Sequence, residues 1–268
     1  MIISRTPFRI SFFGGGTDYP AWYRQHGGAV LAATINKYCY LTCRYLPPFF
    51  EHRLRVVYSK IETCQKLDEI VHPSARETLR YLKLYRGVEI HHDGDLPGRS
   101  GMGSSSSFTV GLLHALYALK GQVVGKRQLA AESIHLEQDI LKETVGSQDQ
   151  VCAAYGGVNR INFLPNGDFS VQPMTLSSER LKALNSHLML FYTGIKRTAS
   201  EVASSYAVGM EERAALLTRM HDYVEQSCAI LNRNQDLTAF GELLHQAWQA
   251  KRALSDKVSN ARVDGMFA

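Results

Sequence analysis

Residues 101–107 of this sequence, GMGSSSS, run directly into an apolar stretch at 108–119, FTVGLLHALYAL. The stretch predicts a buried helix over 104–119, because it has almost no polar face. Glycines let a backbone approach an anion closely, and the first turn of a helix offers unpaired N–H groups and the positive end of the helix dipole. A flexible Gly/Ser linker would not lead straight into a buried helix, and capping a helix needs one serine rather than four.

We therefore predict an anion-binding loop of the kind that holds ATP phosphates. The predicted contact residues are Gly101, Gly103, Ser104, Ser105 and Ser106. Serine hydroxyls add hydrogen-bond donors and an oxygen that Mg²⁺ accepts as a ligand. The loop is not of the Walker A type, because that motif has a lysine after its last glycine and Ser104 follows Gly103 here.

The rest of the chain is β-rich first, mixed in the middle and helical towards its end. Strands are expected within 1–13 (interrupted at Pro7), 28–46 (two strands joined around Asn36 and Lys37), 53–58, 87–92, 156–174 (a hairpin across Asn166 and Gly167) and 187–192. Helices are expected over 74–84, 104–119 and 126–142, and the chain is mainly helical from 200 to about 254. This order lacks the βαβα alternation of a Rossmann fold and predicts the α+β class.

Composition and charge describe a soluble globular enzyme, with 45% hydrophobic and 21% charged residues. The net charge of +5 suits anionic substrates, but the lysines and arginines are scattered, so no nucleic-acid partner is expected. The five cysteines form no CxxC pair and no zinc spacing, which indicates reduced thiols in the cytoplasm. No stretch is long and apolar enough for a membrane span, and the N-terminus lacks a signal-peptide pattern.

Two segments, taken together, resemble the motifs of the GHMP kinases. Pro97 and GMGSS at 101–105 are similar to the second motif of that family, a proline, a short spacer and Gly-Leu-Gly-Ser-Ser before a helix. The first motif of its sugar kinases reads Pro-Gly-Arg, an apolar run and Gly-Glu-His-Thr-Asp-Tyr. RTPFRISFFGGGTDYP at 5–20 matches it at Pro7, Arg9, Gly14, Thr17, Asp18 and Tyr19, while Gly15 and Gly16 replace the Glu-His pair. The GGGTDYP form resembles the branch that phosphorylates D-glycero-D-manno-heptose 7-phosphate at its anomeric hydroxyl, with L-fucokinase a near relative.

The resemblance implies roles for residues outside the loop. It places the catalytic base at Asp149 in GSQDQ (146–150), and a magnesium ligand at Glu137, with Asp139 as the second candidate, together with Ser105. On the residues alone, an aspartate near a helix start is more often a cap or a partner of the helix dipole. An arginine beside Asp149 would hold its carboxylate ionised and stabilise charge in the transition state, and Arg9 is expected in that role.

The acceptor is expected to meet two further segments. Asp18, with Gly15 and Gly16, is expected to contact the sugar, although an aspartate after glycines is also an ordinary turn residue. Lys196 and Arg197 stand between a predicted strand and a predicted helix, a place that suits a substrate phosphate. Solvated loop cations are an equally good interpretation of these two residues.

The fold implied by the resemblance is the two-lobe GHMP kinase fold. Residues 1–155 would form an ATP-binding lobe, with a mixed β-sheet and the buried phosphate-loop helix, and residues 156–268 a C-terminal α+β lobe. The third family motif, a GAGxGG loop, is not found in the sequence. We therefore expect a truncated C-terminal lobe, and ATP binding with lower turnover than in a chain extended by that motif.

The function expected from these motifs is an ATP- and Mg²⁺-dependent kinase of a small sugar phosphate. The expected reaction is transfer of the γ-phosphate to the anomeric hydroxyl of the heptose 7-phosphate, by a cytoplasmic monomer or homodimer without a membrane partner. Alternatives are a kinase of L-fucose or galactose, and a non-catalytic protein that binds nucleotide or sugar on the same fold. A mevalonate-type kinase is disfavoured by the sugar-kinase-like TDY at 17–19.

Overall fold

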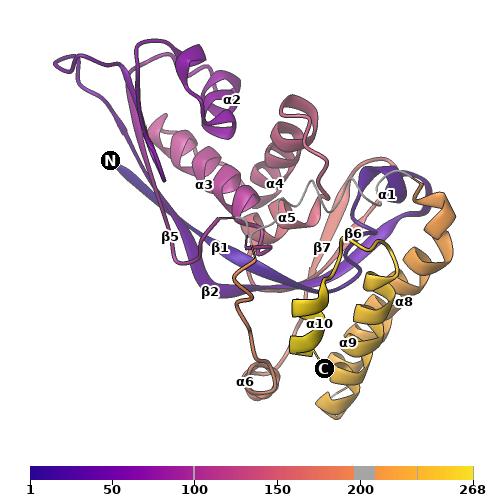
Figure 1. Ribbon diagram of the computed structural model, residues 1–268. Coiled ribbons are helices and arrows are strands. Elements are labelled where there is room, and N and C mark those ends of the chain that lie inside the picture. The colour runs from indigo at the N-terminus through magenta and orange to yellow at the C-terminus, as the bar shows by residue number, and fades with distance from the viewer. Residues whose placement is uncertain (99, 196–208, 234, 268) are drawn as a thin grey trace. The chain divides into compact units, whose positions relative to one another are not determined.

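The computed structural model in Figure 1 describes residues 1–98, 100–195, 209–233 and 235–267. The chain forms two compact units. The first unit comprises residues 1–9, 34–143 and 149–156, and the second comprises 10–33, 144–148 and 157–268. The units therefore interleave along the chain, whereas the sequence prediction drew one boundary after residue 155.

The first unit is built on strands that expose one face and bury the other. Its strands are the beginning of β1 (Ile2–Phe13), the end of β2 (Gly28–Tyr45), β3 (Leu54–Val57), β4 (Ile61–Cys64) and β5 (Val88–Gly94). β5 pairs antiparallel with residues 39–45 of β2 and parallel with β3, which pairs antiparallel with β4. Because side chains alternate along a strand, Cys39, Leu41 and Cys43 share the buried face.

Helices cover that buried face (Figure 1). They are α2 (Pro73–Tyr81), α3 (Ser104–Leu119), α4 (Lys126–His135) and α5 (Gln148–Tyr155), with short 3₁₀ and π-helical turns at Leu67–Glu69 and Leu136–Ile140. The buried helix predicted over 104–119 is confirmed as α3, and most of its residues are buried. The helix predicted over 126–142 ends at His135 and continues as the π-helical turn, a form that is common at functional sites.

The second unit combines a small antiparallel sheet with a helical bundle. Residues 28–33 of β2 pair with β6 (Val158–Phe163), which forms the predicted hairpin with β7 (Phe169–Pro173). The helices are α1 (Pro20–His26), α6 (Ser178–Ser186), α8 (Ala214–Asn232), α9 (Leu237–Arg252) and α10 (Ala261–Phe267), with a 3₁₀ turn at Glu211–Arg213. α8 and α9 pack side by side (Figure 1). Their buried residues share a core with Phe13 and Leu31.

Three predicted strand boundaries were wrong. Residues 28–46 form one strand, because the exposed Asn36 and Lys37 lie where β2 changes partner from β6 to β5. Pro7 does not interrupt β1, which pairs only with β2 among the described strands, so its missing N–H removes no bond from a second described ladder. Residues 187–192 form no strand but follow α6 as exposed irregular chain, because none of the described strands pairs with them.

The five cysteines are buried thiols. Burial raises the pKa of the thiols of Cys39 and Cys43 to about 12, so both are neutral packing groups. No helix in the described ranges is long and apolar enough to cross a membrane.

Candidate active site

The predicted phosphate loop is a sharp turn that ends at the N-terminus of α3. Gly101 and Gly103 have φ values of +78° and +72°, a left-handed conformation that glycine adopts at little cost. Gly103 is the N-cap of α3, and no described side chain caps the helix there. The first-turn N–H groups of a 16-residue buried helix therefore border a position without a side chain, an arrangement that suits an anion.

Arg9 ties this loop to Asp149 within the first unit. Its Nε and Nη2 donate to the two carboxylate oxygens of Asp149, each at 2.8 Å, in a two-point fork. Its Nη1 donates to the carbonyl of Gly101 at 2.8 Å, and its backbone N–H donates to the carbonyl of Met102 at 3.1 Å. Arg9 and Asp149 are separated by 140 positions in sequence, so this pairing is a product of the fold.

Asp149 lies directly against the phosphate loop. A Cβ placed on Gly103 would be 3.3 Å from Oδ2 of Asp149 and 3.3 Å from Cγ of Arg9. The side chains of Arg9 and Asp149 are 14% and 20% exposed, so the pair is shielded but still open to a ligand. The structure thus brings together the residues predicted as base, electrostatic partner and phosphate loop, while their catalytic roles stay predictions.

Glu137 lies in the π-helical turn and is fully buried beneath α3. One carboxylate oxygen, Oε2, accepts hydrogen bonds from the Ser106 hydroxyl at 2.8 Å and from the Gln150 amide at 2.5 Å. The other oxygen, Oε1, is buried and has no hydrogen-bond partner among the described residues. Burial raises the pKa of Glu137 to about 7, against the opposing effect of hydrogen bonds from Ser106, Thr109 and Gln150.

The hydroxyl beside Glu137 belongs to Ser106, whereas the sequence prediction paired Glu137 with Ser105. Ser105 is exposed on the first turn of α3, and its carbonyl accepts a bond from Thr109. Successive helical residues point about 100° apart, so only one of the two serines can face the π-helical turn. The role of Ser105 as a metal ligand stays a prediction, and Ser106 is the serine in contact with the predicted glutamate ligand.

The oxygens around Glu137 fit a hard divalent cation. Both Glu137 Oε1 and Gln150 Oε1 are buried acceptors without a described partner, and such groups carry an energetic cost that a cation would relieve. In the described part of the chain, no three His, Cys, Asp or Glu side chains gather to hold a metal by themselves. A magnesium ion here would therefore draw further ligands from serine, water and nucleotide phosphates.

In the second unit, Asp18 joins two segments that are far apart in sequence. Its carboxylate is 1% exposed and accepts the backbone N–H of Gly16 at 2.9 Å and of Gln148 at 3.4 Å. Its carbonyl accepts the N–H of Ser147 at 2.9 Å. A Cβ on Gly146 would come within 1.9 Å of Asp18 Oδ2, so glycine is required there. Whether Asp18 also contacts sugar stays a prediction.

The segment 14–16 also meets two side chains that the sequence did not single out. Lys251 of α9 donates from Nζ to the carbonyl of Gly15 at 2.7 Å, and the Gln148 amide lies beside the same glycine. Gln148 lies in the GSQDQ segment, next to the predicted base Asp149, so the motif could have indicated it. Lys251 is a single lysine on an amphipathic helix, and nothing in the sequence marks it. The predicted phosphate ligands Lys196 and Arg197 lie outside the described residues.

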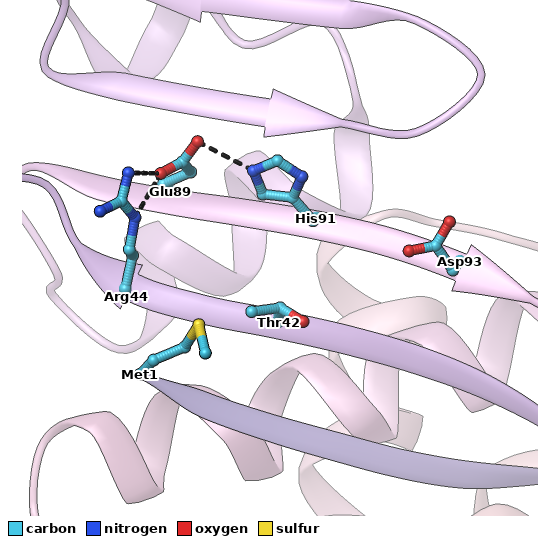
Figure 2. A pocket seen from close by; sticks show the side chains of 6 residues that line it. All are labelled: Met1, Thr42, Arg44, Glu89, His91 and Asp93. Carbon is cyan, nitrogen blue, oxygen red and sulfur yellow. Dashed lines mark hydrogen bonds and ion pairs between the residues drawn. The ribbon is translucent and has the colours of Figure 1, made fainter.

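A separate pocket of about 400 Å³ lies on the sheet of the first unit and contains none of the predicted site residues (Figure 2). Its lining residues are Met1, Thr42, Arg44, Glu89, His91 and Asp93. Figure 2 shows Glu89 bonded to both Arg44 and His91. Although burial alone raises the pKa of Glu89, hydrogen bonds from His91 and Arg44 hold it below its ordinary value. Arg44, Glu89 and His91 are thus directed at one another.

Comparison with known proteins agrees with this geometry. Residues 69–157 match the family described as GHMP kinases N terminal domain. The chain is 26% identical over 279 residues to the D-glycero-alpha-D-manno-heptose 7-phosphate kinase of Campylobacter jejuni, covering 99% of this chain and 81% of the relative. It is 23% identical over 256 residues to a galactokinase of Chloroflexus aurantiacus, covering 90% of this chain and 61% of the relative.

The fold is also that of solved kinases. The crystal structure of a D-glycero-D-manno-heptose 1-phosphate kinase from Bacteroides thetaiotaomicron superposes with a TM-score of 0.80 at 22% identity, covering 94% of this chain and 79% of that one. The matched segment 69–157 contains the phosphate loop, Glu137 and Asp149. Since the motifs, the fold and the geometry around that loop agree, residues 69–157 are a GHMP kinase N-terminal domain, and the related kinases indicate a phosphotransferase of that type.

Proposed function

We propose that this chain transfers the γ-phosphate of ATP to the anomeric hydroxyl of D-glycero-D-manno-heptose 7-phosphate. The observation that carries the proposal is the two-point bond between Arg9 and Asp149, held directly against Gly101 and Gly103 of the phosphate loop. A carboxylate at this place can receive a proton within reach of a bound phosphate. The acceptor is chosen on the resemblance of GGGTDYP to the heptose kinase branch and on the named heptose kinase relative.

The reaction needs positioning and charge stabilisation more than covalent chemistry. Asp149 accepts the proton of the acceptor hydroxyl. The oxygen of that hydroxyl forms a bond to the γ-phosphorus, and the bond from the γ-phosphorus to the ADP oxygen breaks. Arg9 orients the Asp149 carboxylate through two bonds and adds positive charge beside the loop. The N–H groups at the start of α3 receive the phosphate oxygens.

Magnesium is the proposed second cofactor. Glu137 and Ser106 are the residues that would hold it, with Ser105 as the ligand expected from the sequence. When bound, Mg²⁺ neutralises charge on the nucleotide phosphates as transfer proceeds. The unpartnered Oε1 of Glu137 supports this assignment, because a cation is a partner that this buried oxygen lacks.

Gly15, Gly16 and Asp18 are the proposed contacts of the acceptor sugar. Glycines at 15 and 16 leave room where resembling sugar kinases carry the Glu-His pair. Lys196 and Arg197 stay predictions as ligands of the substrate phosphate. A cytoplasmic location and a monomeric or homodimeric state also stay predictions.

The test is an assay of ADP release with a panel of acceptors. The purified chain is given ATP, Mg²⁺ and either the heptose 7-phosphate, galactose, L-fucose or mevalonate, beside a reaction without acceptor. We expect ADP release with the heptose 7-phosphate. An Asp149→Asn variant should lose at least about 10³-fold in kcat while its affinity for ATP changes little. Transfer to galactose or fucose alone would assign another acceptor, and ATP binding without transfer to any acceptor would indicate a binding protein.

A further inference from the structure

The side chain of Lys251 ends at the glycine segment of the second unit. Its Nζ donates to the carbonyl oxygen of Gly15 at 2.7 Å. A Cβ on Gly15 would be 3.6 Å from this nitrogen, and a Cβ on Gly16 would be 3.7 Å from it. The ammonium group therefore borders the space that side chains at positions 15 and 16 would enter.

The three consecutive positions 14–16 do not all require glycine for the same structural reason. At Gly14 a Cβ would be 2.0 Å from the carbonyl oxygen of Ala29, so packing excludes any other residue. Gly16 has a φ of +118°, a conformation that disfavours side chains. Gly15 has neither constraint, because its nearest neighbours would be at ordinary contact distances of 3.5–3.6 Å. The fold accepts a side chain at position 15, so its absence points to a use for the space.

Gln148 supplies a second polar group at this space. Its Nε2 would be 3.6 Å from a Cβ on Gly15, and the residue is only 8% exposed. Its Oε1 is buried and has no hydrogen-bond partner among the described residues. A buried amide oxygen without a partner is costly, and a hydroxyl donor from a ligand would remove that cost. The space is thus bordered by the Lys251 ammonium group and by the amide nitrogen of Gln148, whose amide oxygen lacks a donor.

These contacts match a polyhydroxy compound that carries an anionic group. A lysine attracts a phosphate as a point charge and can donate to its oxygens. A glutamate at position 15, as in the resembling sugar kinases, would place a carboxylate beside the same ammonium group and repel a phosphate. The combination of Gly15 and Lys251 therefore favours a phosphorylated acceptor over a neutral sugar.

We propose that Lys251 is a specificity-determining residue that binds the non-reacting phosphate of the acceptor, while the amide group of Gln148 hydrogen-bonds a hydroxyl of the acceptor. This inference rests on the proposed kinase function and deepens it. The amphipathic helix α9 holds the lysine in place through its buried residues.

The test compares two acceptors that differ only in the phosphate, the heptose 7-phosphate and the same heptose without it. For Lys251→Met, kcat/KM with the phosphorylated sugar should fall about 10- to 100-fold, while the value with the unphosphorylated sugar changes less than about threefold. Gly15→Glu should also lower the ratio of kcat/KM with the phosphorylated sugar to kcat/KM with the unphosphorylated sugar. The matched control is Arg252→Met, since Arg252 follows on the same helix and pairs with Asp264 at 3.0 Å. This control should leave the ratio unchanged.

An equal loss with both acceptors in Lys251→Met would show that the lysine only supports the glycine segment, and would overturn the inference. An unchanged ratio in both Lys251→Met and Gly15→Glu would overturn it as well. If the unaltered chain releases no ADP with any sugar, the proposed function fails. The site is then still tested by calorimetric titration of the chain with each of the two sugars. The inference requires that the phosphorylated sugar binds more tightly and that Lys251→Met loses this preference. Equal binding of the two sugars contradicts it.

Discussion

Replacing Glu137 by glutamine should remove most of a pH dependence of stability. Burial raises the pKa of this carboxyl from an ordinary value of 4.5 to about 7. A raised carboxyl pKa means that the folded state prefers the protonated form. The stability it contributes is fully present below about pH 4.5 and is lost as the pH rises through about 7. One pKa unit corresponds to about 1.4 kcal/mol, so the loss is on the order of 3 kcal/mol.

The assay is urea unfolding between pH 5 and pH 8, without nucleotide or metal. The unaltered chain should lose on the order of 3 kcal/mol of unfolding free energy more than Glu137→Gln over this range, because a glutamine cannot ionise. The matched control is Glu242→Gln, at an exposed position of α9, which should follow the unaltered chain. Mg²⁺ with ATP should stabilise the unaltered chain at pH 8 and stabilise Glu137→Gln less, since the variant lacks the anionic ligand.

Two results would refute this reasoning. Parallel pH profiles for the unaltered chain and Glu137→Gln would mean that the buried carboxyl does not titrate in this range. Equal stabilisation of both proteins by Mg²⁺ with ATP would mean that Glu137 is not a ligand of the metal. The first result tests the titration of the buried Glu137 carboxyl, and the second tests its role as a metal ligand. Either prediction can fail while the other holds.

Three further predictions concern positions that the fold constrains differently. Gly146→Ala should lower the unfolding free energy by about 3 kcal/mol or more in urea titration, because its Cβ would overlap the Asp18 carboxylate at 1.9 Å; a loss below about 1 kcal/mol would contradict the close packing there. Gly241→Ala, at an exposed site in α9 with nothing within 4 Å of the added Cβ, should raise the unfolding free energy by about 0.5–1 kcal/mol, and a fall would count against an intact helix. Arg9→Lys should lower kcat about 10- to 100-fold at nearly constant ATP affinity, since lysine cannot form the two-point bond to Asp149; an unchanged kcat would remove Arg9 from the mechanism.

Local features were predictable from the sequence. The predicted buried helix after the serine run is α3, because a helix that is apolar on all sides is stable only when it is buried in the core. The hairpin across Asn166 and Gly167 formed because that pair supplies a left-handed turn position, and Gly167 has a φ of +88°. Each of these features depends on residues that are close together in sequence.

Features that depend on distant pairing were harder to predict. The continuity of β2 depends on its change of partner at Asn36 and Lys37, and no local pattern records which strands will be neighbours. The apolar run at 187–192 satisfies the strand pattern yet finds no described strand to pair with. The interleaving of the two units along the chain follows from such pairings.

Within the candidate site, too, local features were predictable from the sequence and long-range contacts were not. The phosphate loop was predicted from local chemistry, whereas Arg9 and Asp149, 140 positions apart, were paired only through family resemblance. The choice between Ser105 and Ser106 depends on the rotation of α3 against the π-helical turn, which the sequence does not specify. Lys251 was missed because its partner is a backbone carbonyl, a contact that leaves no trace in residue type.

The most direct test of the account is to identify the product of the reaction with the heptose 7-phosphate. Phosphorus NMR of the unaltered chain with ATP and Mg²⁺ should show a second sugar phosphate, coupled to the anomeric proton and formed in equal amount to ADP. The Asp149→Asn variant should form neither product. ADP release that is independent of the sugar, or a new phosphate on any hydroxyl other than the anomeric one, would contradict the proposed reaction.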